Sequence, residues 1–205
     1  MSNVIDTRDK ILEVALELFA NNGFDGTSTR EICKGADVNI SMILYYFGSK
    51  EGLYKTIIQN WFDKQSEYLD AYFDMQKFQT LSRKEKAKAM LSFLSKTVDF
   101  LYGEMSDNLM LFLIREQKNI AVGVIPPVVL FLRKVLSSIL DKDENSKDIV
   151  YAGLFIASQI SSPRIMTVFK APYGKESFTG EDFEIIKRNL NDYVTMIFKN
   201  AGVDL

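Results

Sequence analysis

The side chains that carry most catalytic chemistry are scarce in this sequence. Histidine is absent, and cysteine occurs once, at Cys33. A chain without histidine cannot form a Ser-His-Asp or Cys-His pair, and it lacks a common ligand of zinc sites. The remaining carboxylates show no paired acid–base motif, and there is no glycine-rich phosphate loop. We therefore expect neither an enzyme nor a bound cofactor or metal ion.

Composition places the chain among folded proteins. Its 205 residues are 47% hydrophobic and 25% charged, with a net charge of −2. These values argue against disorder and leave room for one large domain or two small ones. No run reaches the roughly 18 uncharged apolar residues of a transmembrane helix. The N-terminal residues lack the apolar core of a signal peptide, so we expect a cytoplasmic protein with no membrane partner.

Apolar residues recur at helical spacing along most of the chain, and no segment of useful length alternates as a strand does. The pattern predicts an all-α protein of about nine helices. The predicted helices cover residues 7–22, 28–35, 40–47, a long segment from Lys50, 83–102, 105–119, 125–141, 146–170 and 181–201.

The first fifty residues carry clear signals for helix ends. Gly23 is a natural left-handed terminator, and Ser28 with Glu31 has the spacing of a capping box. A break at 36–39 separates two short helices, and Gly48 closes the second of them. Two short helices joined by a tight turn form a helix-turn-helix, whose second helix enters the major groove of DNA. Spacing alone leaves open a second interpretation, an ordinary corner of a small helical bundle.

The stretch from Thr27 to Leu53 is more specific, since it reads TSTREICKGADVNISMILYYFGSKEGL. It resembles the N-terminal signature of the TetR family of bacterial transcriptional repressors, and the resemblance extends over about residues 8–58. The matching positions are Ser28-Thr29, Ile32-Cys33, Ala36 to Asn39, Tyr45 to Phe47 and Ser49 to Leu53. The resemblance implies a helix-turn-helix DNA-binding domain at 1–58 and a helical effector-binding and dimerisation domain at 59–205.

Four positions depart from the family pattern. Asp37 stands at the usual glycine of the turn, and we expect it to adopt the left-handed backbone there at some cost. Ser41 and Met42 replace a common glycine and a common threonine. Leu44 stands where the family often has a tyrosine that touches DNA, and we expect Leu44 to face the core instead. The departures concern the base contacts and leave the expected fold unchanged.

The resemblance and the chemistry of the side chains together imply a set of DNA contacts. Hydroxyl, guanidinium and free N–H groups at the start of the 28–35 helix can meet phosphate. Ser41 can bond to a base edge, and Ile40 or Met42 can touch a thymine methyl group. Alternatives are that Ile40 is half-buried filler and that Tyr46 only closes the small domain. The expected DNA-binding residues are Thr29, Arg30, Asn39, Ile40, Ser41, Met42, Tyr45, Tyr46 and Lys50.

Charge gives this expected interface an unusual character. Residues 1–60 hold six basic and eight acidic side chains, so the strongly basic surface typical of DNA-binding domains is missing. Arg30 and Lys50 are expected to contact phosphate because a cation at either end of the unit has little structural role to fill. We therefore expect few phosphate contacts per subunit, modest affinity at physiological salt and a requirement for dimerisation.

Residues 61–205 are neutral, with 19 basic and 19 acidic side chains, and they are rich in Phe, Tyr and Met. At helical spacing such side chains suit an ordinary core. The alternative, which the resemblance implies, is that some of them line an apolar effector cavity. The expected effector-binding residues are Trp61, Phe62, Phe93, Phe112 and Arg115. Glu116 and Gln117 are further polar candidates, for which a surface ion pair is the alternative.

The last two predicted helices are the expected dimer surface. Small residues between 152 and 162 would let two helices approach closely. The final helix offers an apolar stripe made of Phe183, Ile186, Leu190, Tyr193, Val194, Ile197 and Phe198. With the family resemblance, this pattern implies a homodimer.

These expectations combine into one function. We expect a homodimeric repressor that binds a near-palindromic DNA operator through its 40–47 helix and is released by a small apolar effector. One alternative is a DNA-binding protein of the same fold that a protein partner controls. Another is an all-helical enzyme or carrier, which the missing histidine and the single cysteine disfavour.

Overall fold

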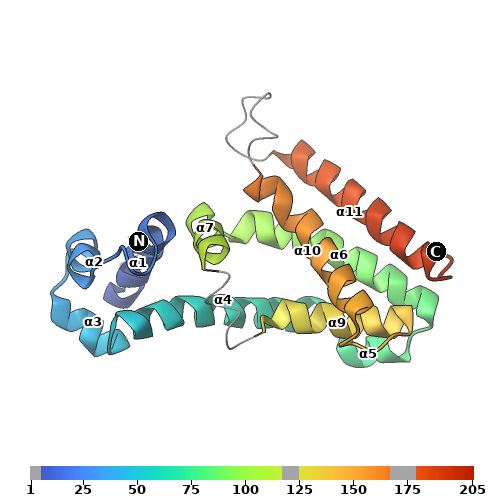
Figure 1. Cartoon of the computed structure of the whole chain (residues 1–205), viewed down its shortest axis with the longest axis horizontal. Coiled ribbons are helices and arrows are strands. Elements are labelled where there is room, and N and C mark those ends of the chain that lie inside the picture. The colour runs from blue at the N-terminus through green and yellow to red at the C-terminus, as the bar shows by residue number, and fades with distance from the viewer. Residues whose placement is uncertain (1–5, 117–124, 167–178) are drawn as a thin grey trace, which may run out of the picture. The chain divides into compact units, whose positions relative to one another are not determined.

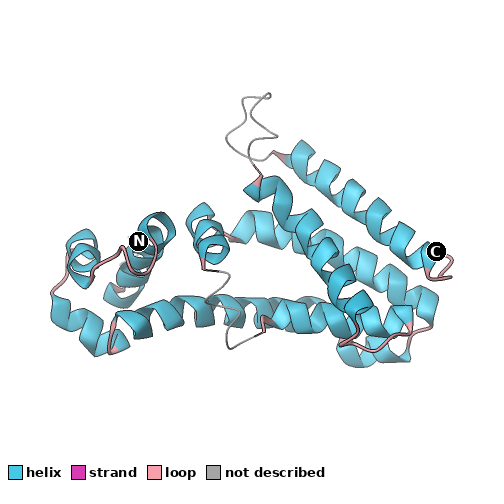
Figure 2. Ribbon diagram, in the orientation of Figure 1, coloured by secondary structure: helices cyan, strands magenta, loops and turns pink. Residues whose placement is uncertain are grey.

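The computed structural model describes residues 6–116, 125–166 and 179–205, and within these ranges it contains helices and turns but no strand (Figure 2). The helices, in chain order, are α1 (Thr7–Asn22), α2 (Thr29–Ala36), α3 (Ile40–Phe47), α4 (Lys50–Tyr72), α5 (Met75–Thr80), α6 (Arg83–Glu104), α7 (Asp107–Arg115), α9 (Pro127–Leu140), α10 (Lys147–Ile165) and α11 (Gly180–Asn200) (Figure 1). The all-α expectation is confirmed. None of these helices combines the length and the apolar character needed to cross a bilayer.

The helix boundaries agree closely with the sequence prediction in the first part of the chain. The bounds of α1 and α3 match the predicted ones, and α2 is shifted by one residue. The prediction missed α5, whose six residues are too few to show a helical period. The Asp74 carboxylate caps α5 by accepting a 2.9 Å hydrogen bond from the Lys77 N–H. The predicted helix ends at 117–119 and 167–170 lie outside the described residues.

Backbone contacts divide the chain into two compact units. Unit 1 consists of Met1–Ser66 with Met105–Ile125, and unit 2 of Glu67–Glu104 with Pro126–Leu205. The sequence analysis predicts two domains with a single boundary after residue 58. The contact-based units instead each combine two segments, because α7 packs against α1. The assignment of DNA binding and effector binding to separate domains remains a proposal.

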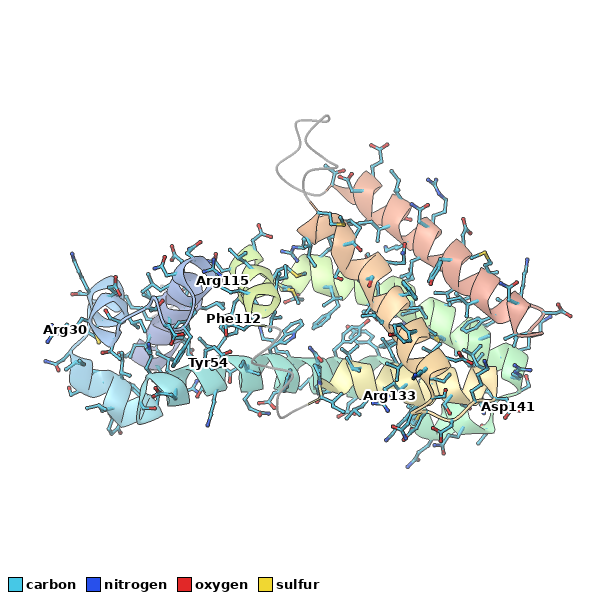
Figure 3. The ribbon with its side chains drawn as sticks, in the orientation of Figure 1. Arg30, Tyr54, Phe112, Arg115, Arg133 and Asp141 are labelled. Carbon is cyan, nitrogen blue, oxygen red and sulfur yellow. The ribbon has the colours of Figure 1, made fainter. Side chains whose placement is uncertain are left out.

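Unit 1 has one apolar core, to which α1, α2, α3, α4 and α7 all contribute. Its buried members are Ile11, Ala15, Phe19, Ala20, Ile32, Cys33, Ala36, Ile43, Leu53, Ile57 and Phe112. Phe112 of α7 is fully buried, and its ring centroid lies 5.4 Å from that of Tyr54 and 6.3 Å from that of Phe19. Figure 3 shows Phe112 and Tyr54 beside each other. Helix α7 therefore completes the core of the unit that holds the helix-turn-helix.

Unit 2 is built around α6, α9, α10 and α11, which pack against one another. The apolar stripe of α11 lies in this core. Ile186, Leu190, Val194 and Phe198 are all buried there. The prediction that this stripe faces a second subunit is wrong for these four residues, because α6 of the same chain covers the helix.

Helix α10 leaves a different apolar strip uncovered. Val150, Tyr151, Leu154 and Phe155 are 42%, 56%, 55% and 52% exposed. Their spacing places them on one side of the helix. Gly153, one of the small residues expected at the dimer surface, is instead buried, and a Cβ at this position would lie 3.7 Å from the Leu136 side chain of α9.

Candidate nucleic-acid interface

Helix α2 begins with a complete capping box, as its sequence predicts. The Ser28 hydroxyl accepts a 3.2 Å hydrogen bond from the N–H of Glu31, and the Glu31 carboxylate accepts a 2.8 Å bond from the N–H of Ser28. The Ser28 hydroxyl also donates to this carboxylate, and the two bonds from Ser28 lower the pKa of Glu31. The acidic side chain in the first turn is therefore engaged with its own helix end, beside the exposed Arg30.

The turn between α2 and α3 has the backbone of a helix-turn-helix. Asp37 adopts the left-handed conformation, with φ 55° and ψ 50°, and so takes over the role of the glycine in the family pattern. The N–H of Val38 bonds to the Cys33 carbonyl at 3.0 Å, which ends α2. Asn39 then starts α3, because its Oδ1 accepts a 2.9 Å hydrogen bond from the Ser41 N–H. The expectation that Asp37 tolerates this position is confirmed.

Helix α3 is anchored by one side and exposed on the other. Ile43 is 1% exposed and belongs to the unit 1 core. On the opposite side Ile40 is 47%, Leu44 61% and Tyr45 79% exposed, and Ser41 is exposed beside them. The helix therefore presents a face of two aliphatic side chains and two hydroxyl groups.

Lys50, at the start of α4, is tied into unit 1. Its ammonium group donates hydrogen bonds of 2.9 Å to the carbonyl oxygens of Phe24 and Thr27, and it lies 4.2 Å from the centroid of the Phe24 ring. The buried Thr27 hydroxyl in turn donates to the Gly23 carbonyl at 2.8 Å. Lys50 therefore holds the turn before α2 against the start of α4. The expectation that this cation has little structural role is wrong.

A family model described as "Bacterial regulatory proteins, tetR family" matches residues 11–57, which span α1 to the first turns of α4. This is the segment that builds the helix-turn-helix geometry described above.

Residues 11–57 therefore form a helix-turn-helix segment of the tetR type.

Two relatives and one solved structure illustrate how far the similarity reaches. Over 66 residues the chain is 46% identical to the "Probable HTH-type transcriptional regulator YttP" of Bacillus subtilis, covering 32% of each protein. Over 54 residues it is 43% identical to the "HTH-type transcriptional repressor NicS" of Pseudomonas putida, covering 26% of each. The match thus spans about a quarter to a third of these relatives. The crystal structure of the regulator FadR from Bacillus subtilis in complex with stearoyl-CoA has the same fold, with a TM-score of 0.58 and 17% identity over 90% of this chain and 96% of that one.

Leu44 is an exposed residue of α3 that the sequence analysis did not place on the candidate interface. We expected it to face the core, and that expectation is wrong, because 61% of its surface is exposed. Helix α3 reads ISMILYYF and is apolar on every side, so periodicity could not identify its buried face. The TetR-family signature offered a signal, since the family often places a DNA-touching tyrosine at this position.

The other predicted DNA contacts fall into two groups. Arg30, Asn39, Ile40, Ser41 and Tyr45 are exposed, as a contact with DNA requires. Thr29, Met42, Tyr46 and Lys50 are half-buried. Met42 and Tyr46 pack against the unit 1 core, and the ring centroid of Tyr46 lies 4.9 Å from that of Tyr45. All nine lie in unit 1, and their contacts with DNA remain proposals.

The five predicted effector-binding residues divide between the two units. Phe93 lies in the core of unit 2, where its ring centroid is 4.9 Å from that of Phe131. Phe112 lies in the core of unit 1, and Arg115 donates a 2.6 Å hydrogen bond to the Asn21 carbonyl at the end of α1. Trp61 and Phe62 are buried in the part of α4 that belongs to unit 1. Gln117 lies outside the described residues.

One apolar pocket in unit 1 includes a predicted effector-binding residue. It has a volume of about 230 Å³ and is lined by Leu12, Glu13, Leu16, Ile57, Asn60, Trp61, Lys64 and Leu109.

Cys33 lies elsewhere in this unit as a small buried side chain, and burial raises the pKa of its thiol. Over the described ranges no group of three or more acidic or cysteine side chains is placed to hold a metal ion.

Proposed function

We propose that the chain is a dimeric transcriptional repressor whose α3 reads the major groove of an operator. The observation that carries the proposal is the exposed face of α3, which stands on a braced helix-turn-helix while Ile43 anchors its opposite side. Such a face has no packing role inside the unit, and a recognition helix needs this kind of exposure. The direction of regulation is supported by the relative from Pseudomonas putida, which is named a repressor.

Phosphate contacts in this proposal come from the edges of the helix-turn-helix. Arg30 is exposed in the first turn of α2, where its guanidinium can reach a phosphate oxygen. The hydroxyl of Tyr46 and the third N–H of the Lys50 ammonium can also donate hydrogen bonds to phosphate oxygens. The small number of cations limits the electrostatic part of the affinity for DNA. Tight binding therefore needs the helix-turn-helix units of two subunits.

A second copy of the chain supplies the other reading head. The uncovered strip of Val150, Tyr151, Leu154 and Phe155 on α10 supports this part of the proposal, since a two-fold axis can bury the same apolar strip from both subunits. Dimerisation would place the two α3 helices in major grooves about 34–36 Å apart, which calls for a near-palindromic operator.

An apolar effector is the remaining part of the proposal. The similar FadR structure holds stearoyl-CoA, which supports an acyl-type ligand for this fold. In this chain Trp61 lines an apolar pocket between α1, α4 and α7, where a ligand would press on the helices that brace α3. A ligand that binds the DNA-competent form less well than another form lowers operator affinity by shifting the population.

A second candidate function keeps the DNA contacts but replaces the effector with a protein partner. It is favoured by the burial of Phe93 and Phe112, two expected effector contacts, in ordinary cores. Titration of acyl chains of increasing length into the operator complex distinguishes the two. Release of DNA supports the effector, whereas binding that stays constant supports the partner.

The experiment that tests DNA recognition is selection from a randomised duplex library with the full-length protein. We expect an enriched inverted repeat that the protein binds as a dimer in gel-shift and sedimentation measurements. Arg30→Ala should weaken binding and reduce the slope of log affinity against log salt by about one per subunit. Arg188→Ala, which removes an exposed arginine of α11, is the matched control and should leave the slope unchanged. Failure to enrich any sequence would overturn the proposal.

A further inference from the structure

The exposed face of α3 lacks the side chains that read most base edges. Guanine is commonly read by Arg or Lys, adenine by Asn or Gln, and cytosine by Asp or Glu. The eight residues of α3 include none of these six types. The face therefore has no group that can make the usual bidentate contact with a purine.

Asn39 is the nearest amide side chain, and its geometry does not fill this gap. A bidentate contact with adenine uses both the oxygen and the nitrogen of the amide. The Asn39 oxygen is already engaged as the cap of α3, where it accepts the 2.9 Å hydrogen bond from the Ser41 N–H. Giving up this bond would remove the cap and destabilise the first turn of α3.

What α3 offers instead is aliphatic surface. Ile40 and Leu44 are 47% and 61% exposed, and they are four residues apart, so they lie next to each other along one side of the helix. Exposed aliphatic surface is unfavourable in water. In the major groove the apolar group available to cover it is the C5-methyl group of thymine.

We propose that Ile40 and Leu44 read thymine methyl groups, so that the centre of each operator half-site consists of A·T pairs. The neighbouring hydroxyl groups of Ser41 and Tyr45 bond to polar base edges or phosphates beside the methyl contacts. The inference rests on the proposed DNA binding and goes beyond it by naming the base and the chemical group. It also assigns a methyl contact to Leu44 in place of Met42, because Met42 is half-buried against the unit 1 core.

The test replaces thymine with uracil, which removes the methyl group and keeps the hydrogen-bonding edges of the base. The operator that library selection yields is synthesised with single thymine-to-uracil replacements at each position of a half-site. We expect wild-type affinity to fall about fourfold for each contacted methyl group and to stay constant elsewhere. Measurements at reduced salt keep the weaker complexes within range.

Variants of the full-length protein then assign the methyl contacts to side chains. Leu44→Ala should bind the thymine operator more weakly than wild type does. At the position that Leu44 reads, this variant should have equal affinity for the thymine and the uracil operator. Ile40→Ala should behave in the same way at its own position. Leu111→Ala is the matched control, because Leu111 is 42% exposed on α7 and lies outside α3. This control should keep the full response to uracil.

The outcomes separate this inference from the proposed function. If library selection enriches nothing, the DNA-binding proposal itself fails. If an operator is found but no uracil replacement changes affinity by more than about 1.5-fold, the methyl contact is disproved while DNA binding stands. A methyl effect that persists in both alanine variants assigns the reading to other residues and overturns the roles of Ile40 and Leu44. An enriched half-site with a G·C centre overturns the inference as well.

Discussion

The phenol of Tyr54 donates a 2.9 Å hydrogen bond to the carboxylate of Glu116, which joins α4 to the residue that caps α7. Glu116 is only 4% exposed. Burial, followed by the hydrogen bond to the Glu116 carboxylate and its negative charge, raises the pKa of Tyr54 well above its usual range. With the bond from Arg115 to the Asn21 carbonyl, this contact fastens the end of α7 to both α1 and α4 (Figure 3).

Tyr54→Phe should destabilise the protein because it removes a hydrogen-bond donor from the buried carboxylate of Glu116. We expect the free energy of unfolding to fall by about 1–3 kcal/mol, measured by urea denaturation. Tyr151→Phe removes a hydroxyl from a side chain that is 56% exposed and should change stability by less than about 0.5 kcal/mol. Equal urea midpoints for wild type and Tyr54→Phe would show that the hydrogen bond contributes nothing to stability.

Lys50 and Arg30 should respond differently to the loss of their charge. Lys50→Met deprives the Phe24 and Thr27 carbonyls of a charged donor, so the free energy of unfolding should fall by about 1–3 kcal/mol. Arg30→Met, at an exposed position, should change stability by less than about 0.5 kcal/mol while it weakens operator binding. Thermal unfolding and gel shifts on the two variants check this pair. Unaltered stability in Lys50→Met would contradict the structural role of Lys50.

The first three helices could be predicted from sequence because their limits depend on local signals. The Ser28–Glu31 capping box, the left-handed Asp37 and the glycine that closes α3 each act within a few residues. The exposed face of α3 could not be derived in this way. Its aliphatic and aromatic residues leave the helix apolar all round, and only the packing of Ile43 against other helices decides which side is buried.

Contacts between distant segments account for the other differences. The side chain of Lys50 meets carbonyl oxygens at residues 24 and 27, and Phe112 of α7 enters a core built by residues 11–57. The apolar stripe on α11 was visible in the sequence, but a stripe looks the same whether its own chain or a second copy covers it. In the folded chain α6 and α10 both pack against α11.

Tyr102 should make stability fall at alkaline pH. Its hydroxyl donates a 2.8 Å hydrogen bond to the Ile160 carbonyl, and burial raises its pKa from 10.0 to about 12, against the opposing effect of the Arg164 charge. The unfolded chain therefore loses this proton first. The stabilisation is complete below pH 10 and is lost as the pH rises from about 10 to about 12. Urea titrations across this range should show a smaller decline for Tyr102→Phe than for wild type, whereas Tyr45→Phe, at a side chain that is 79% exposed, should follow wild type.

The α10 strip offers a direct test of the proposed dimer. Leu154 is 55% exposed in the single chain, so Leu154→Glu should leave its fold intact and place two charges against each other at a two-fold interface. We expect light scattering to report a monomer, and operator affinity to fall by more than about 100-fold because one head carries too few phosphate contacts to bind alone. Leu111→Glu, at an exposed leucine of α7 in unit 1, is the control that should remain dimeric. If the Leu154→Glu protein is still a dimer, the dimer interface lies on another surface. If it is a monomer with full operator affinity, binding does not require two subunits.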